Sequence, residues 1–342
     1  MLGYGLLMSI KTHVMNKNPR FTKHLVEKGF FVSSLLVVVD AGARGGYEDH
    51  WKWFKNQIRL IGFEPDEKEC GELNTKEKDG NKKYYPVALS GAKGKRALYL
   101  RHHHPSSSFF QCNEKLLARL PDYKNAKIEG KKMVRTTDLD SFLNEEKIEQ
   151  SDFLKLDTEG AEFDILQGAM QTLQNSIFGL STEVAFMPFR KKQRLFSDVD
   201  ILMRSSGFSL YDLPIFSTTR TCLSPYAYVE VAGPTEYGQA MWGQALYLRD
   251  AVEDFETEAG RRKWNMTRVL KLASIFELFR LNDCAIELLG AAEEKGIIRG
   301  YPVETFFDFL TPPCKGKIVS YKEYRTYLKK TPPIFSHKRR KP

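Results

Sequence analysis

The sequence predicts an α/β fold, with a doubly wound and mostly parallel sheet followed by a helical appendage. An uninterrupted apolar run rich in valine at 35–39 is apolar on both faces, as buried parallel strands are. Strand-like runs then alternate with helix-like segments over short loops, which is the rhythm of repeated βαβ units. After Asp250 only amphipathic helical segments follow. A domain boundary is therefore expected near this residue.

Strands and helices are expected to alternate from residue 21 to residue 248. Apolar runs that end at a turn or an acidic residue predict the strands, at 35–40, 58–63, 84–89, 132–135, 153–156, 177–184, 207–213 and 245–248. Apolar residues at helical spacing predict the helices, at 21–30, 48–56, 138–146, 160–173 and 198–204. Thr137 is the expected N-cap of the helix at 138–146.

The chain length of 342 residues predicts about two domains. We expect an N-terminal helical segment at 1–30, an α/β domain at 31–250, and a helical appendage with a basic tail at 251–342. The alternation breaks between 91 and 128, where residues 97–100 predict a hairpin arm and a polar loop follows. This stretch is interpreted as an inserted loop.

Composition excludes several classes of protein. With 42% hydrophobic and 28% charged residues, the chain is neither disordered nor a coiled coil. No apolar run approaches the roughly 20 residues of a membrane-spanning helix, and residues 1–10 lack the basic start of a signal peptide. Five cysteines without a CxxC pair favour a reduced cytoplasmic protein and disfavour a zinc site.

The net charge of +9 permits anionic partners. Four consecutive basic residues, Lys338 to Lys341, leave room for peripheral contact with an anionic membrane. Nucleic acid is a disfavoured partner because no basic stripe interleaved with aromatic residues accompanies the charge. The sequence makes no prediction about oligomeric state.

A glycine turn follows the first predicted strand. In an open parallel sheet, ligands bind beyond the carboxyl ends of the strands where the strand order reverses. The pattern Asp40-x-Gly42-Ala43-x-x-Gly46 occupies that position, and its glycines let the backbone pass close to a ligand. A plain glycine turn is the alternative. The pattern lacks the GxGxxG order of dinucleotide-binding loops, which disfavours NAD.

Acidic residues mark the ends of two further strands. Glu64 follows the second strand, where a carboxylate can accept hydrogen bonds from the ribose hydroxyls of an adenosine-containing cofactor. Taken alone, it could equally be an exposed acid at a strand end. Asp157, Glu159 and Glu162 lie within six positions after another strand. Helix capping explains one or two of these three carboxylates.

The run from Phe153 to Ala169, FLKLDTEGAEFDILQGA, resembles the signature of FkbM-type methyltransferases. These enzymes use S-adenosylmethionine to methylate hydroxyl groups, often on sugars. The resemblance extends from about Val37 to Leu213 and includes the segments at 39–43, 62–66, 86–89, 106–108 and 136–140, together with Glu183. It implies a class I methyltransferase sheet of seven strands.

The resemblance also implies positions around the cofactor. Asp40, Gly42, Ala43 and Gly46 are implied around its methionine part, and Glu64 on its ribose. Val87, Ala88 and Leu89 are implied near the adenine. Asp157, with Glu159 behind it, is implied at the edge that the sulfonium and the acceptor share. An acidic rim suits the positive sulfonium.

Methyl transfer to a hydroxyl needs a group that removes the hydroxyl proton, or a metal. The carboxylate candidates are Asp157, Glu159 and Glu183. His103 and His104 are rival candidates because a neutral imidazole suits this task near pH 7, although a simple polar loop also explains them. A single metal held by Asp157, Glu183 and a histidine is less favoured, because the spacing matches no common ligand pattern. No metal is predicted.

The leading hypothesis is therefore an O-methyltransferase that acts on a hydroxyl of a sugar, glycan or glycosylated metabolite, as in polysaccharide biosynthesis. An NAD-type oxidoreductase on a similar sheet is one alternative. A non-catalytic binding module is another, since a fold alone does not establish activity. The joint presence of Asp40, Glu64, Asp157 and Glu183 favours an enzyme.

Overall fold

The computed structural model describes residues 13–77, 80–121, 127–222 and 238–331. The basic tail at 338–341 lies outside the described residues. In the described part of the chain, no helix has the length and apolar character needed to cross a membrane.

Two compact units make up the chain. The first runs from Phe31 to Asp250 and includes His13 and Val14, and the second combines Met15–Phe30 with the residues after Asp250. The division after Asp250 falls where the sequence changes to helical segments. The segment 1–30 does not form a unit of its own, because its residues are shared between the two units.

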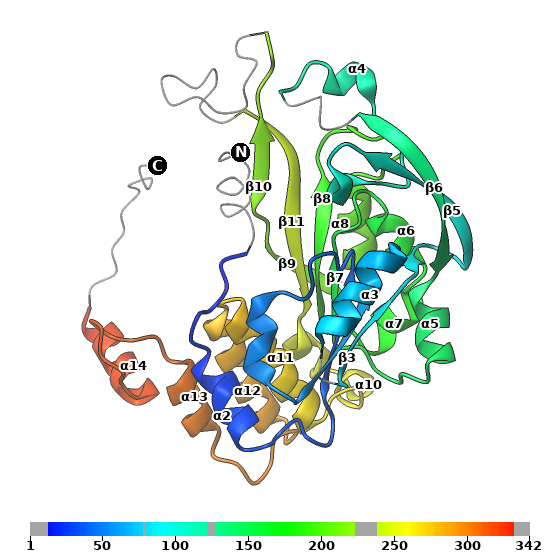
Figure 1. Cartoon of the computed structure of the whole chain (residues 1–342). Helices are drawn as coiled ribbons and strands as arrows, with labels where there is room; N and C mark the ends of the chain where they lie inside the picture. The colour runs from blue at the N-terminus through cyan, green and yellow to red at the C-terminus, as the bar shows by residue number, and fades with distance from the viewer. Residues whose placement is uncertain (1–12, 78–79, 122–126, 223–237, 332–342) are drawn as a thin grey trace. The chain divides into compact units, whose positions relative to one another are not determined.

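The first unit is built on an eight-stranded sheet with the order β10-β11-β8-β7-β1-β2-β3, in which β9 also pairs with β11 (Figure 1). The strands are β1 (Leu36–Ala41), β2 (Ile58–Phe63), β3 (Lys82–Tyr85), β7 (Phe153–Leu156), β8 (Gly179–Ala185), β9 (Phe208–Asp212), β10 (Ile215–Thr218) and β11 (Gln239–Arg249). Because β9 and β10 pair with successive parts of β11, the sheet has seven strand positions. Strands β3, β2, β1, β7 and β8 are parallel, and β11 is antiparallel to β8. This confirms the predicted class I methyltransferase sheet.

Both faces of the central strands are covered, which explains the continuous apolar run in β1. Val39 and Leu154 belong to a core cluster that includes residues of four helices on one face of the sheet, α5 (Leu139–Glu145), α6 (Glu162–Gln167), α7 (Met170–Asn175) and α8 (Phe196–Ser205). On the other face, Trp51 of the 3-10 helix η2 (Asp49–Phe54) packs on Phe153, with ring centroids 5.3 Å apart. All six residues of β1 are buried as a result.

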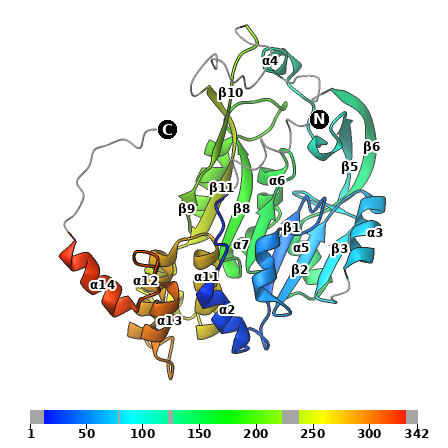
Figure 2. The same ribbon diagram turned by 60° about the vertical axis from the view of Figure 1, so that its left-hand side comes forward.

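A three-stranded sheet with the order β4-β6-β5 fills the inserted region, and Figure 2 shows β5 and β6 as a curved pair beside the main sheet. It consists of β4 (Ala88–Leu89), β5 (Gly94–Arg101) and β6 (Ile128–Thr137), accompanied by η3 (His104–Ser106) and α4 (Glu114–Leu117). The hairpin arm expected at 97–100 is part of β5. The single strand expected at 84–89 is wrong, because the chain bends at Pro86 and Val87, and β3 and β4 belong to different sheets.

Three local predictions also need correction. The helix expected at 48–56 is the shorter η2. The helix expected at 160–173 is divided into α6 and α7, because the backbone departs from helical geometry at Gly168 and Ala169, where ψ is 7° and 15°. The N-cap of α5 is Asp138 rather than Thr137, since the Asp138 carboxylate accepts a hydrogen bond from the Ser141 amide at 2.8 Å.

The second unit is helical. Its described helices are α2 (Arg20–Glu27), α9 (Ala251–Asp254), α10 (Glu258–Arg261), α11 (Met266–Leu278), α12 (Asn282–Glu294), α13 (Val303–Leu310) and α14 (Tyr321–Lys330). The buried carboxylate of Glu277 in α11 accepts hydrogen bonds from the amides of Phe21 and Thr22 in the first turn of α2. This contact joins the N-terminal helix to the C-terminal ones.

We predict that Asp138→Ala lowers the free energy of unfolding by about 1 kcal/mol, because the first turn of α5 loses its side-chain cap. Asp138→Asn is the matched control and should keep most of the stability, since asparagine caps helices equally well. Urea denaturation of the three proteins measures the effect. Equal losses in both variants would contradict the assignment of this cap.

Candidate functional site

Four acidic residues share the carboxyl edge of the parallel strands. Asp40 lies near the end of β1, and Glu183 lies near the end of β8. Glu64 and Asp157 directly follow β2 and β7. Because these four strands are parallel and adjacent in the order β2-β1-β7-β8, the sheet brings the acids to one edge, as the strand pattern predicts.

The glycine turn lies against the loop that follows β7. Gly42 has a φ of +83°, and a Cβ at this position would overlap the backbone carbonyl oxygen of Asp157. Only glycine fits there. The amides of Gly42 and Ala43 both donate hydrogen bonds to the Phe63 carbonyl at 3.1 Å. These amides therefore hold the turn against β2 and are already used within the protein.

Gly46 and Ala43 are the other residues of the turn that were predicted near the cofactor. Gly46 also has a positive φ, of +93°. The side chain of Ala43 is fully buried against Cys70, Leu73 and Tyr84. Any contact of Ala43 with a ligand is thus limited to its backbone.

Lys155 is a buried cation at the centre of the edge. Its Nζ lies 3.1 Å from Asp40 Oδ1 and 3.8 Å from Asp157 Oδ2. Burial by itself lowers the pKa of Lys155, but the charges of Asp40, Asp157 and Glu48 outweigh it, and the net shift is upward. Burial raises the pKa of Asp40, and Lys155 opposes that rise. Lys155 was missed in the sequence, where a lysine within an otherwise apolar strand was the available signal.

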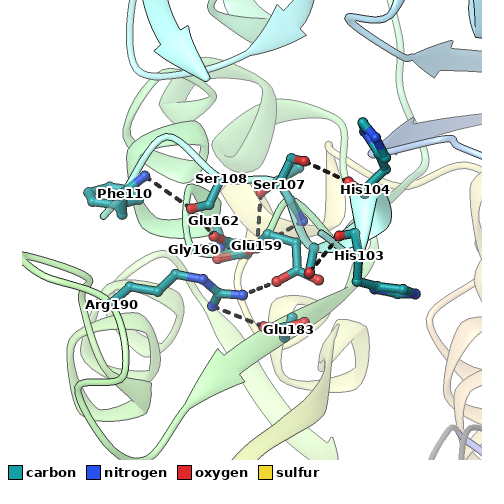
Figure 3. A network of polar contacts seen from close by, with 12 residues as sticks. His103, His104, Ser107, Ser108, Phe110, Glu159, Gly160, Glu162, Glu183 and Arg190 are labelled. Carbon is teal, nitrogen blue, oxygen red and sulfur yellow. Dashed lines mark hydrogen bonds and ion pairs between the residues drawn. The ribbon is translucent and has the colours of Figure 1, made fainter. Parts of the chain in front are cut away.

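A second cation, Arg190, joins two of the candidate carboxylates (Figure 3). Its Nη2 is paired with Glu159, and its Nη1 lies 3.6 Å from Glu183 Oε1. Carboxylate oxygens of Asp157, Glu159 and Glu183 lie within 4.8 Å of one another. Arg190 is only 3% exposed, so its charge acts in a poorly solvated environment. Arg190 itself was not among the site residues predicted from the sequence.

Glu159 has a backbone conformation that is rare outside glycine, with a φ of +60°. Two contacts hold it. Ser108 Oγ donates a hydrogen bond to the Glu159 carbonyl at 2.6 Å, and Arg190 pairs with the side chain. Strained residues that the surroundings hold in place are concentrated at functional sites. The serine cluster at 106–108 thus contributes through Ser108 as a support of the loop.

Glu162 organises the same loop from inside. Its Oε1 accepts hydrogen bonds from the Thr158 amide, the Thr158 hydroxyl and the Gly160 amide, at 2.9, 2.9 and 3.1 Å. Its carboxyl group is buried, and burial raises its pKa. With one oxygen committed to three donors, Glu162 shapes the loop that presents Asp157 and Glu159.

Glu183 has the most perturbed carboxyl group of the cluster. Burial is the largest cause, and the negative charges of Asp157 and Glu162 add to it, so that the pKa of Glu183 is raised well above its usual range. Arg101 and Lys155 oppose the shift. A carboxyl group of this kind keeps its proton to a higher pH than an ordinary glutamate.

The histidines lie on the outer side of the loop. His103 and His104 are exposed residues at the start of η3, and Figure 3 shows their imidazole rings pointing away from Glu159 and Glu183. The neighbouring His102 is exposed as well and lies 2.7 Å from Glu129. The structure therefore brings the three carboxylates together and leaves the two histidine rings outside that cluster.

The Methyltransferase FkbM domain matches residues 40–210, which is half of the chain. The chain belongs to the FkbM methyltransferase family. It is an S-adenosylmethionine-dependent methyltransferase, and the cofactor expected from the sequence is that of the family. The match begins at Asp40 and includes the glycine turn, Glu64 and the loop from Asp157 to Glu162.

Several solved structures have a distant similarity to this FkbM methyltransferase. Methyltransferase FkbM from Methylobacillus flagellatus is 11% identical, with a TM-score of 0.32, and the match covers 63% of this chain and 43% of that chain. Magnesium protoporphyrin IX methyltransferase from Synechocystis, solved with bound S-adenosylmethionine, is 10% identical over 73% of this chain and 92% of its own, with a TM-score of 0.30. Precorrin-6y C5,15-methyltransferase from Geobacter metallireducens is 10% identical over 70% and 93%, also with a TM-score of 0.30. No curated protein matches the sequence.

The residues at the edge fit the cofactor of the family. Glu64 is 5% exposed, and its Oε1 accepts a hydrogen bond from the Asp66 amide at 2.8 Å. No described residue donates a hydrogen bond to its Oε2, which leaves this oxygen for a ribose hydroxyl. Burial raises the pKa of Glu64, as expected of a carboxyl group that lacks part of its partners.

The predicted adenine contacts lie beside Glu64. Its amide donates a hydrogen bond to the Tyr85 carbonyl at the end of β3, and Val87 follows in the bend. Ala88 and Leu89 form β4 and are 7% and 2% exposed. Their role at the adenine stays a prediction.

We predict that Gly42→Ala lowers the free energy of unfolding much more than Gly45→Ala does. Both glycines have a left-handed backbone, with φ near +83° and +82°, so both variants lose about 1 kcal/mol to strain. Nothing lies within 4 Å of a Cβ at Gly45, whereas a Cβ at Gly42 overlaps the Asp157 carbonyl, which adds about 1–3 kcal/mol. Urea denaturation compares the two. Equal losses would show that the turn and the Asp157 loop are not in contact.

Proposed function

We propose that this FkbM methyltransferase transfers a methyl group to a hydroxyl of a sugar, a glycan or a glycosylated metabolite, in polysaccharide biosynthesis. The observation that carries the proposal is the group of carboxylates of Asp157, Glu159 and Glu183 within 4.8 Å at the edge of the sheet. A hydroxyl becomes a good nucleophile when a neighbouring base accepts its proton. These carboxylates supply that base, and the family supplies the methyl donor.

When bound, S-adenosylmethionine supplies the methyl group, and its sulfur takes the electron pair of the broken carbon–sulfur bond. The chain has two tasks. It holds the acceptor oxygen close to the methyl carbon, and it takes up the hydroxyl proton as the new carbon–oxygen bond forms. The acidic surroundings of Lys155, formed by Asp40 and Asp157, also favour a positive charge at this edge.

Asp157 is the best candidate to meet the acceptor hydroxyl. Its side chain is 46% exposed, whereas those of Glu159 and Glu183 are 21% and 12% exposed. Glu159 is committed to Arg190. Glu183, with its raised pKa, is suited to hold the proton behind Asp157. In this arrangement His103 and His104 have no part in the chemical step.

The proposal also covers the cellular compartment of the enzyme and its contact with a membrane. All five cysteines are free thiols, which supports a reduced cytoplasmic compartment. For membrane contact, the exposed basic residues of α14, Lys322, Arg325, Lys329 and Lys330, add to the basic run at 338–341. These charges support a peripheral position on an anionic membrane.

We predict that Glu64→Ala weakens binding of S-adenosylmethionine and S-adenosylhomocysteine alike, because both carry the ribose that the carboxylate accepts. Loss of this charge-assisted hydrogen bonding costs on the order of 2–3 kcal/mol, which is a factor of about 30 to 150 in Kd. Isothermal titration calorimetry measures both ligands. Glu67→Ala, which removes an exposed acid of the neighbouring α3 (Glu67–Lys76), is the control and should bind normally. Unchanged affinity in Glu64→Ala would remove this residue from the site.

We predict that Asp157→Asn lowers kcat by roughly a hundredfold or more and changes S-adenosylhomocysteine affinity much less, because the shape stays and the basicity is lost. Incorporation of labelled methyl into a panel of sugar acceptors identifies a substrate and measures the rate. Glu159→Gln should retain more of the chemical step, and His103→Gln and His104→Gln should keep the acidic limb of the pH–rate profile. Near-normal turnover of Asp157→Asn with saturating acceptor would make the histidine loop the leading candidate.

A further inference from the structure

The guanidinium of Arg101, at the end of β5, is buried and donates no hydrogen bond to a described residue. The residue is 4% exposed, and its Nε and Nη2 are fully buried with no partner for either. Its Nη1 donates no hydrogen bond to a described residue. The chain holds other arginines differently. Arg96 on the same strand donates hydrogen bonds to Ser90 and Asp164 at 2.7 and 2.8 Å.

A buried guanidinium without hydrogen bonds lowers the stability of the fold unless another group accepts from its N–H donors. Burying an ionised group without partners costs free energy, and nearly all buried polar groups in folded proteins are hydrogen-bonded. Burial lowers the pKa of Arg101, but a guanidinium remains protonated at any physiological pH. Arg101 therefore keeps its charge, and its donors require an acceptor that the described residues do not provide.

Arg101 lies within the electrostatic range of Glu183, which also pairs with Arg190. Glu183 is the carboxylate whose charge acts on Arg101, and Arg101 in turn lowers the pKa of the buried Arg190 after the effect of burial. Arg190 also lacks hydrogen bonds at Nε and Nη1, while its Nη2 is used by Glu159. Glu183 Oε1 thus lies 3.6 Å from Arg190 Nη1, and the charge of Glu183 also acts on Arg101. Lys155, by contrast, is surrounded by the charges of three acidic residues, Asp40, Asp157 and Glu48.

The position of Arg101 is on the acceptor side. Its backbone amide lies 3.4 Å from Ser107 Oγ, in the loop whose Ser108 holds the Glu159 carbonyl. Glu64, the candidate for the ribose, lies instead after β2, beyond β7 and β1 in the sheet order. Arg101 therefore leads directly into the loop that supports Glu159.

We propose that Arg101, supported by Arg190, binds an anionic group of the acceptor, a carboxylate, sulfate or phosphate on the same molecule as the hydroxyl. This inference rests on the proposed function and narrows its substrate class to acidic or phosphorylated sugars. The planar guanidinium suits such groups because its parallel N–H donors match two of their oxygens. The anion supplies the acceptors that the buried nitrogens lack.

The first test uses simple anions as probes. The melting temperature of the protein saturated with S-adenosylhomocysteine is followed against acetate, sulfate and inorganic phosphate at constant ionic strength. We expect at least one of them to raise the melting temperature in a saturable way, and Arg101→Met to weaken that binding at least tenfold. Arg204→Met, which removes an exposed arginine of α8, should retain it. Failure of all three anions to bind, or equal binding by Arg101→Met, overturns the proposal.

The second test separates a ligand-binding arginine from a structural one. Without added anion, Arg101→Met should be at least as stable as the natural protein, because an apolar side chain of similar length replaces an unsatisfied charge. A structural ion pair would instead lose stability when the arginine is removed. Arg101→Lys keeps the charge without the paired donors and should also fold, with weakened anion binding. Failure of both variants to fold counts against the proposal.

The failure of this inference is distinguishable from that of the proposed function. Both Arg101 variants should bind S-adenosylhomocysteine with unchanged affinity, since Arg101 is not among the residues expected to hold the cofactor. Anion binding in a protein that methylates no hydroxyl acceptor would contradict the proposed function and leave the anion site standing. Transfer to an acidic or phosphorylated sugar that is unaffected by Arg101→Met would support the function and overturn the anion site.

Discussion

A buried ion pair between Lys155 of β7 and Asp40 of β1 occupies the point where the sheet reverses its strand order. Such a pair adds little to stability relative to an apolar pair, but loss of one partner leaves an uncompensated charge in the core. The pair therefore ties the two central strands together in one arrangement. Asp157 shares the same lysine, and its carbonyl leaves room only for a glycine at Gly42. The glycine turn at 42–46 and the loop that begins at Asp157 therefore fix each other's position.

The loop after β7 shows how strain is maintained at a functional site. Glu159 keeps its left-handed backbone because Ser108 holds its carbonyl, Arg190 holds its carboxylate, and Glu162 fixes the amides around it. These supports come from three separate parts of the chain. Around this loop the carboxylates of Asp40 and Asp157 lie beside Lys155, Glu183 lies beside Arg190, and the charge of Arg101 acts on Glu183. A cationic methyl donor and an anionic acceptor group would each find the opposite charge on its own side.

The inserted region supplies the part of the site that the methyltransferase sheet does not. Strand β5 ends at Arg101, and the loop beyond it reaches Glu159 through Ser108. The parallel strands present the acids to a cofactor, as in any doubly wound sheet. Substrate choice is therefore expected to depend on the insertion more than on the common sheet.

The sequence by itself determined the mostly parallel sheet and the edge where the acids gather, because a buried strand followed by a turn or an acid is a local pattern at Asp40, Glu64 and Asp157. The FkbM signature, a run of adjacent residues, was local as well. The cap at Asp138 is a local contact with Ser141, whereas the separation of β4 from β3 was decided by tertiary packing, since β4 pairs with β6 in another sheet. The sequence did not predict the roles of Lys155, Arg190 and Arg101, because these roles also depend on tertiary contacts. A charged side chain acquires its role from the partners that folding brings to it, and those partners lie on other strands and loops.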